Sequence, residues 1–239
     1  MTDSRDRHLV VVAAGDVPAR EALDVAWPGW DTAIAGVVAA DGGLAGAEGL
    51  GLTVDVVVGD LDSADPIRLT AAQAAGTRVA AASSDKDESD TELAVLEALR
   101  LGATRVTILG ALGGSRLDHA LANVWLLGHE ALADTPAVLL DDEVRVSLLF
   151  APLPGGVAIE RLLPGRIGAT VSLLPFNGPV DGVRTRDLRY PLRGEPLEAG
   201  PARGLSNVRT GPAASVAIVG GSLLIIEAAM PPGGLSSEP

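Results

Sequence analysis

Short apolar runs alternate with amphipathic stretches over residues 8–150 of the chain. The apolar runs predict strands at 8–14, 34–40, 54–58, 78–81, 104–109, 137–141 and 144–149. The stretches between them have the apolar spacing of helices, at 18–26, 43–50, 64–75, 90–101 and 117–132. Strands that alternate with helices form mostly parallel sheets covered by helices on both faces. We therefore expect an N-terminal α/β domain of the Rossmann-like class over residues 1–150.

The ends of two of these helices carry capping signals. Ser89 and Glu92 have the spacing of a capping box, and Asp65 followed by Pro66 is typical of a helix start. Trp125 is on the apolar side of the helix expected at 117–132. We expect it to pack in the core.

The pattern changes after residue 150. Residues 151–156, Ala-Pro-Leu-Pro-Gly-Gly, predict a linker. Beyond it no helical pattern recurs, and glycine and proline separate extended segments at 157–161, 168–174, 180–187, 213–219 and 222–228. These segments predict an antiparallel β-sandwich domain over residues 157–230. The last residues, 231–239, are rich in proline, glycine and serine, and we expect a flexible tail.

Composition narrows the classes of partner. A net charge of -13 argues against nucleic acid and anionic membranes as partners, so small molecules are expected. The absence of cysteine excludes disulfides, thiolate metal sites and a cysteine nucleophile. The chain has no apolar run of the roughly 18–20 residues that a membrane span needs. Its first residues do not resemble a secretory signal, and the cytoplasm is the expected location.

Polar motifs follow four of the apolar runs. They are Asp41-Gly42-Gly43, Gly59-Asp60-Leu61-Asp62-Ser63, Lys86-Asp87-Glu88-Ser89-Asp90 and Gly113-Gly114-Ser115-Arg116-Leu117-Asp118-His119. In an open α/β sheet, ligands bind outside the carboxyl ends of the strands. The motifs are therefore expected to meet in one crevice.

The aspartates of these motifs are candidate metal ligands. Asp60 and Asp62, two residues apart on a turn, can offer oxygens to one Mg²⁺ ion, although a solvated turn is the plainer reading of such a pair. Asp87 and Asp90 stand at a helix start, where the helix dipole favours carboxylates without any function. If several of these carboxylates lie within about 5 Å of one point, each pair repels by about 3 kcal/mol at an effective dielectric near 20. A cation or bound protons must then compensate.

Other residues of the motifs are candidates for phosphate contacts. Gly113-Gly114 can let backbone N–H groups approach a phosphate, and Arg116 can fork onto its oxygens, although a Gly-Gly pair is more often a tight turn. The single lysine, Lys86, places a compact charge among the acids. His119 beside Asp118 is either a hydrogen-bonding or acid–base group, or a structural histidine. Neither a P-loop nor a G-x-S-x-G motif occurs.

The order and spacing of these motifs resemble the thiamine pyrophosphokinase family. The family motifs are A-D-G-G, here 40–43; G-D-x-D-S, here 59–63; K-D-x-[TS]-D, here 86–90; and G-G-R-x-D-H, here 113–119 with Ser115 inserted and Ala122-Asn123 following. Segments 171–174, 188–192 and 204–207 resemble the β domain of the family, in which a Ser-Asn pair lies near thiamine. The chain departs from the family pattern at the inserted Ser115, at Val208, where an acidic residue often follows that pair, and in a C-terminal half without tryptophan.

The resemblance implies a thiamine diphosphokinase, which transfers the pyrophosphoryl group of ATP to thiamine and releases AMP. It implies Mg²⁺ on Asp60, Asp62 and Asp90, with positive charge from Lys86 and Arg116, and Asp118 orienting a metal-bound water or accepting the hydroxyl proton. The residues implied in positioning ATP or thiamine are Asp41, Gly42, Gly43, Ser63, Asp87, Ser89, Gly113, Gly114, His119, Ser206 and Asn207. It also implies a homodimer whose site lies between subunits. The alternatives are a metal-dependent nucleoside polyphosphate hydrolase and a non-enzymatic binding module.

Overall fold

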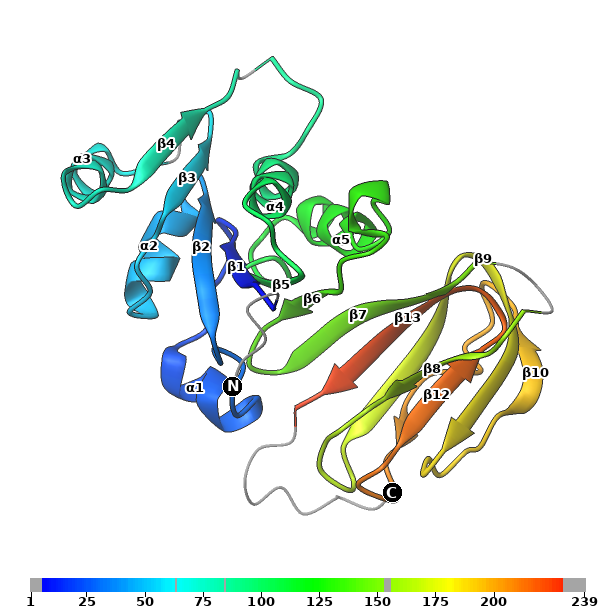
Figure 1. Cartoon of the computed structure of the whole chain (residues 1–239). Helices are drawn as coiled ribbons and strands as arrows, with labels where there is room; N and C mark the ends of the chain where they lie inside the picture. The colour runs from blue at the N-terminus through cyan, green and yellow to red at the C-terminus, as the bar shows by residue number, and fades with distance from the viewer. Residues whose placement is uncertain (1–5, 63, 84, 153–155, 230–239) are drawn as a thin grey trace. The chain divides into compact units, whose positions relative to one another are not determined.

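The computed structural model describes residues 6–62, 64–83, 85–152 and 156–229. The chain divides into two compact units, 1–142 and 143–239. Each unit has its own hydrophobic core, and Figure 1 shows the elements of both. In the described part of the chain, every helix is too short or too polar to span a bilayer.

The first unit contains a parallel sheet. Its strands are β1 (His8–Val12), β2 (Ile34–Ala40), β3 (Val56–Gly59), β4 (Arg78–Ala81), β5 (Arg105–Leu109) and β6 (Ala137–Leu140). Their order is β4-β3-β2-β1-β5-β6, and every pairing among them is parallel. All five residues of β1 are buried, as expected of a strand covered on both faces. The predicted strands of this sheet are confirmed, with small differences at their ends.

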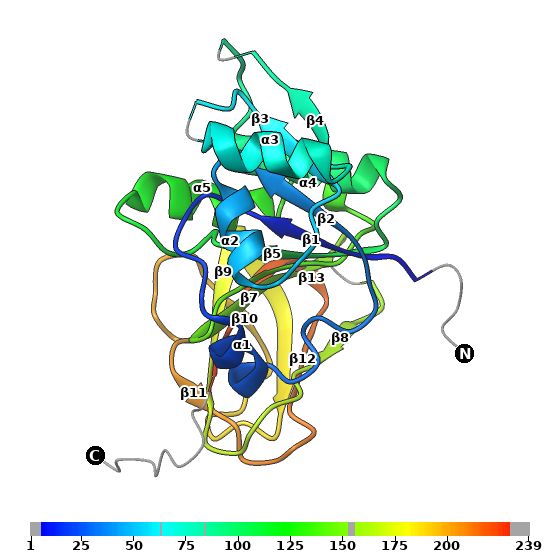
Figure 2. The ribbon, with the colours of Figure 1, turned by 90° about the vertical axis from the view of Figure 1, so that its left-hand side faces the viewer.

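Helices cover both faces of this sheet. They are α1 (Arg20–Ala26), α2 (Gly43–Gly49), α3 (Pro66–Ala74), α4 (Asp90–Arg100) and α5 (Leu117–Leu126), with a short 3-10 helix, η1 (Glu130–Leu132). In Figures 1 and 2, α2 and α3 lie on one side of the strands and α4 and α5 on the other. The capping signals are confirmed, because the Ser89 hydroxyl accepts a hydrogen bond from the Glu92 N–H at 3.1 Å and the Asp65 carboxylate accepts one from Ile67 at 2.8 Å.

The strand order reverses next to β1. The chain runs outward from β1 to β4 and then returns to place β5 on the other side of β1. The chain therefore turns toward one edge of the sheet after β1 and toward the other edge after β5. The two connections diverge, which opens a crevice at the carboxyl ends of these two strands. This reversal is what positions the candidate site.

The second unit is an antiparallel sandwich. Its strands are β7 (Val144–Ala151), β8 (Ile159–Leu162), β9 (Thr170–Arg186), β10 (Arg193–Leu197), β11 (Asn207–Val208), β12 (Ser215–Ile218) and β13 (Gly220–Ala228). The first half of β9 pairs with β13, which also pairs with β7, and its second half pairs with β12, which also pairs with β8. The strand changes sheets near Asn177 and Gly178, where both residues have positive φ angles of 58° and 136°. One strand thus contributes to both sheets.

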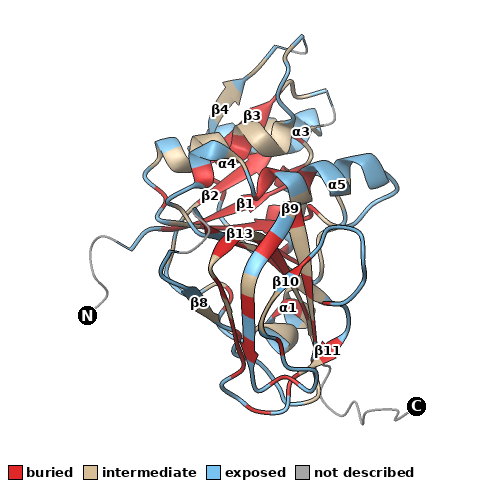
Figure 3. Cartoon of the chain, turned by 90° about the vertical axis from the view of Figure 1, so that its right-hand side faces the viewer, coloured by how far each residue is buried: buried red, intermediate tan, exposed pale blue. Residues whose placement is uncertain are grey.

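Three expectations differ from the structure. The units divide after Asp142 rather than at residue 150, because β7 pairs along its whole length with β13. The expected linker at 151–156 begins inside β7, and residues 153–155 of it lie outside the described residues, as does the tail at 231–239. Trp125 is not in the core, since its exposed fraction is 55%. Figure 3 shows that buried residues gather on the strands, whereas much of the helix surface is exposed.

Candidate active site

A cavity of about 660 Å³ in the first unit lies at the carboxyl ends of the strands on either side of the reversal. The loop after β1, residues 13–16, and the loop after β5, residues 110–116, form part of its wall. Ten of the residues predicted from the motifs line this cavity: Asp41, Asp60, Asp62, Lys86, Ser89, Asp90, Gly113, Gly114, Arg116 and His119. The fold therefore gathers most of the motifs around one space.

Three carboxylates form a cluster in this cavity. One oxygen from each of Asp41, Asp60 and Asp62 lies within 4.8 Å of the others. Asp41 is buried and has a positive φ of 44°, and its N–H donates to the Val58 carbonyl at 2.8 Å, which ties the turn after β2 to β3. The N–H of Asp62 donates to the Asp60 carboxylate at 3.3 Å. The third carboxylate of this cluster is Asp41, whereas the family resemblance implies Asp90 beside Asp60 and Asp62.

The carboxylates of this cluster repel one another. The neighbouring Asp60 carboxylate raises the pKa of Asp62, and partial desolvation and the charge of Asp41 act in the same direction. A hard divalent cation prefers carboxylate oxygens as ligands, and its charge offsets the repulsion between them. The residues present therefore fit Mg²⁺.

Lys86 and Asp90 form an ion pair beside the cluster. The Lys86 ammonium donates to Asp90 Oδ1 at 2.6 Å, and only 14% of the Lys86 side chain is exposed. This hydrogen bond raises the pKa of Lys86 against the opposing effect of burial, and the charges of Asp60 and Asp41 add to the increase. Lys86 is thus held as a cation facing three aspartates.

The glycine-rich loop after β5 is closely packed against the loop after β1. The N–H of Gly15 donates to the Gly110 carbonyl at 3.0 Å, and a Cβ atom at Gly15 would lie 2.4 Å from that oxygen. The Asn123 side chain donates to the Ala111 carbonyl at 2.9 Å from within α5. Asp16 also lines the cavity, yet no motif pointed to it; its position after the central strand β1 was the available signal.

Arg116 and Asp118 face each other at the start of α5. The guanidinium donates to both carboxylate oxygens, at 3.0 and 2.6 Å, and both side chains are about two thirds exposed. These hydrogen bonds from Arg116 lower the pKa of Asp118 to about 2. Arg116 lines the cavity whereas Asp118 does not, so the pair holds the guanidinium at the mouth.

Several predicted residues are not brought into this cavity. Gly42, Gly43 and Asp87 do not line it, and Ser63 lies outside the described residues. Ser89 reaches the wall while capping α4. Ser206 and Asn207 belong to the second unit, where the Asn207 side chain accepts from the Tyr190 N–H at 2.9 Å and donates to its carbonyl at 2.7 Å. Asn207 therefore supports the backbone around Tyr190, which is 62% exposed.

Known proteins resemble this chain in sequence over both units. The family model described as "Thiamin pyrophosphokinase, catalytic domain" matches residues 30–139, and "Thiamin pyrophosphokinase, vitamin B1 binding domain" matches residues 160–221. Thiamine pyrophosphokinase 3 of Oryza sativa subsp. japonica is 28% identical over 160 residues. That match covers 64% of this chain and 58% of the rice protein, so the chain spans less than two thirds of this relative.

Solved structures resemble the chain in fold. Thiamine pyrophosphokinase from Bacillus subtilis has a TM-score of 0.78 and 22% identity, covering 94% of this chain and 100% of that one. A family protein from Enterococcus faecalis has a TM-score of 0.74 and 25% identity, with the same coverage. The two family models together match most of the described residues, one in each unit. The chain belongs to the thiamin pyrophosphokinase family.

Proposed function

We propose that this protein is a thiamine diphosphokinase, which transfers the pyrophosphoryl group of ATP to thiamine and forms thiamine diphosphate and AMP. The observation that carries the proposal is the cavity in which three clustered carboxylates, a lysine and an arginine meet a glycine-rich loop. These are the parts that positioning and charge neutralisation of a polyphosphate require. The match to both domains of the family supports thiamine as the acceptor.

The carboxylate cluster is proposed to hold Mg²⁺. Asp60 and Asp62 are the central ligands in this proposal, and Asp41, the third member of the cluster, joins them. Asp90 is a further candidate ligand because it lies close to Asp41, on the other side of Gly59. A Cβ atom placed on Gly59 would be 3.1 Å from Asp90 Oδ1 and 3.0 Å from the Asp41 Cβ. When bound, the ion supplies neutralisation of phosphate charge and a template for the phosphate oxygens.

The remaining side chains are proposed to bind and orient the substrates. Lys86 and Arg116 offer cationic hydrogen-bond donors to phosphate oxygens, and Gly113 and Gly114 let the backbone approach them. Arg116 holds the pKa of Asp118 near 2, so this carboxylate stays ionised at neutral pH and can accept a hydrogen bond, but it is a weak proton acceptor. Base catalysis is the smaller contribution, because phosphoryl transfer depends mainly on positioning and electrostatics.

Thiamine contacts are proposed for the second unit. Ser206 and Asn207 belong to the segment matched by the vitamin B1 binding domain, which supports a role near the vitamin. We further propose a homodimer with the site between subunits, and the cytoplasm as the location, where ATP is available. Sedimentation equilibrium tests the dimer, and a monomer at all protein concentrations would contradict it.

The test is to incubate the protein with thiamine, ATP and Mg²⁺ and to quantify the products. Equal amounts of AMP and thiamine diphosphate are expected. ADP with thiamine monophosphate would instead indicate an ordinary kinase. Breakdown of ATP without thiamine would favour the hydrolase.

A matched pair of variants separates the enzyme from a binding module. Asp62→Asn removes one carboxylate of the cluster, and Asp134→Asn makes the same change at an exposed position outside the cavity. We expect Asp62→Asn to lose turnover by at least about 100-fold while remaining folded, and Asp134→Asn to match the parent. Absence of turnover in the parent, with thiamine still bound, would indicate a binding module.

A further inference from the structure

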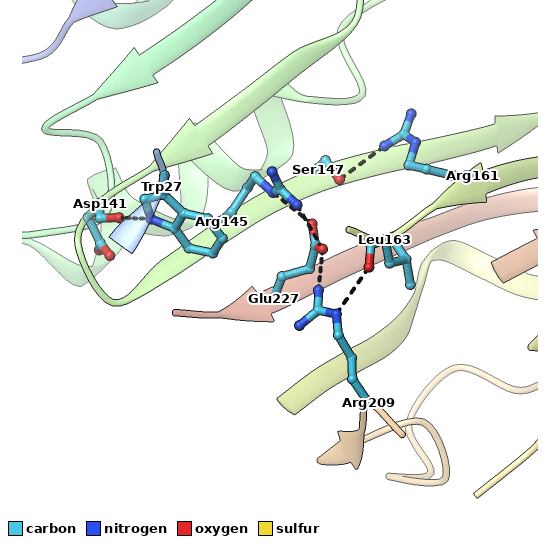
Figure 4. Close-up of polar contacts among 8 residues, drawn as sticks. All are labelled: Trp27, Asp141, Arg145, Ser147, Arg161, Leu163, Arg209 and Glu227. Atoms are coloured by element: carbon cyan, nitrogen blue, oxygen red, sulfur yellow. Dashed lines mark hydrogen bonds and ion pairs between the residues drawn. The ribbon is translucent and has the colours of Figure 1, made fainter. Parts of the chain in front are cut away.

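A charged cluster lies inside the sandwich of the second unit (Figure 4). Glu227, whose side chain is 3% exposed, accepts two hydrogen bonds from Arg145, at 2.8 and 2.9 Å. Arg209, whose side chain is 1% exposed, donates to the same carboxylate and to the Leu163 carbonyl. Both oxygens of Glu227 are therefore occupied by Arg145 and Arg209.

A third arginine enters this region from the opposite sheet. Arg161 on β8 stands across from Val216, a core residue, so its side chain is on the inward face of its sheet. Ser147 on β7 stands across from the buried Ile225 and is inward on the other sheet. Arg161 Nη1 donates to Ser147 Oγ at 3.0 Å, so the two sheets are joined by this hydrogen bond.

The guanidinium of Arg161 is half-buried, but its acceptor is neutral. Within residues 6–62, 64–83, 85–152 and 156–229, no carboxylate forms an ion pair with it. The adjacent Glu160 points to the opposite face of β8 and pairs with Arg186. Burial lowers the pKa of Arg161, and the charge of Arg145 acts in the same direction while Glu227 opposes it. The desolvated charge is thus only partly compensated.

We propose that Arg161 and Ser147, with Arg145 two residues before Ser147 on the same face of β7, form a binding site for a small tetrahedral oxyanion of the phosphate class. The planar fork of Arg161 has donors left beyond the one used for Ser147, and the Ser147 hydroxyl retains a proton to donate. Glu227 is shared with Arg145 and Arg209 and compensates the charge of Arg161 only in part, so a bound oxyanion adds the negative charge that is lacking. The site goes beyond the proposed function, because none of its residues lines the cavity of the first unit.

The experiment follows the arginine side-chain Nε–Hε signals of the full chain by NMR during titration with inorganic phosphate. Sodium chloride at equal ionic strength is the reference. We expect a saturable shift of the Arg161 signal with phosphate and none with chloride. The matched variants are followed through the Arg145 signal. Arg161→Gln is expected to abolish its response to phosphate, whereas Arg184→Gln, which makes the same change at an exposed position of the second unit, leaves the response intact.

A milder variant keeps the test valid if Arg161→Gln fails to fold. Ser147→Ala removes only the hydroxyl, and we expect phosphate affinity to fall about tenfold, as for the loss of a charge-assisted hydrogen bond. The proposal is overturned if chloride produces the same shift, or if phosphate moves only the Arg116 signal of the other unit. It is also overturned if the Arg161 signal changes with protein concentration instead of phosphate, since an acidic group of a second copy would then be the occupant.

Discussion

Gly59 offers a sharp test of how closely the carboxylates are packed. It ends β3 with a φ of +148°, and a Cβ there would lie 3.0 Å from the Asp41 Cβ and 3.1 Å from Asp90 Oδ1. Gly76 also has a positive φ, +104°, but a Cβ there would meet no atom within 4 Å. Gly59→Ala and Gly76→Ala therefore share backbone strain, and only the first also crowds the site.

The magnitudes follow from these contacts. A non-glycine residue in such a backbone conformation costs about 1–3 kcal/mol, so both variants should lose that much free energy of unfolding. In Gly59→Ala the neighbouring side chains must also move by a few tenths of an ångström. A misplacement of about 1 Å can cost about 100-fold in rate, so we expect these smaller shifts to lower the turnover of Gly59→Ala about tenfold below that of the parent. Gly76→Ala should retain the parent turnover.

Urea unfolding would measure the stability of both variants, and AMP release at saturating thiamine, ATP and Mg²⁺ would measure turnover. Divalent-ion affinity, measured with Mn²⁺ by electron paramagnetic resonance, would report on the carboxylates without requiring catalysis. The reasoning is refuted if Gly59→Ala loses stability as Gly76→Ala does but keeps both the turnover and the metal affinity of the parent. Equal losses of turnover in the two variants would also refute it, because strain alone would then explain the effect.

Two further predictions concern charged pairs. Glu227→Gln leaves the buried Arg209 without its carboxylate, so urea unfolding should show a loss of about 3–5 kcal/mol in the free energy of unfolding. The same change at the exposed Glu198 should alter that free energy by no more than about 0.5 kcal/mol. A similarly small loss in both variants would contradict the prediction. Arg116 depresses the pKa of Asp118, so a carbon-13 NMR titration should give a midpoint of about 2 that rises toward 3.8 in Arg116→Gln. An unchanged midpoint in that variant would mean that another group holds the carboxylate ionised.

The sequence predicted the first sheet well because central strands such as β1 and β3 are buried on both faces. A continuous run such as Val56–Gly59 is then apolar throughout, and two of the helices, α3 and α4, begin at residues whose side chains cap them. The second unit was harder to predict. The segment Arg193–Leu197 contains charged residues and a proline, and β11 is two residues long, so neither has a recognisable strand pattern.

The boundary and the carboxylate cluster show where sequence patterns fail. A proline- and glycine-rich run at 151–156 resembles a linker, whereas the division lies in the acidic turn before β7, which only long-range pairing with β13 reveals. Asp41 joins Asp60 and Asp62 because a positive φ turn after β2 directs it there. Such a turn cannot be read from hydrophobic periodicity.

The hydrogen bond between Gly15 and Gly110 has a consequence for synthesis of the protein. The two glycines are far apart in the chain, and β1 needs β5 as its neighbour before their loops can meet. A ribosome synthesises the chain from its N-terminus onward, at about 5–20 residues per second. The first four strands can therefore pair while the cavity at the carboxyl ends of the strands is still missing one wall. If the proposed function holds, nascent chains stalled before β5 should not retain ATP, and binding should begin only after the chain has returned to the middle of the sheet.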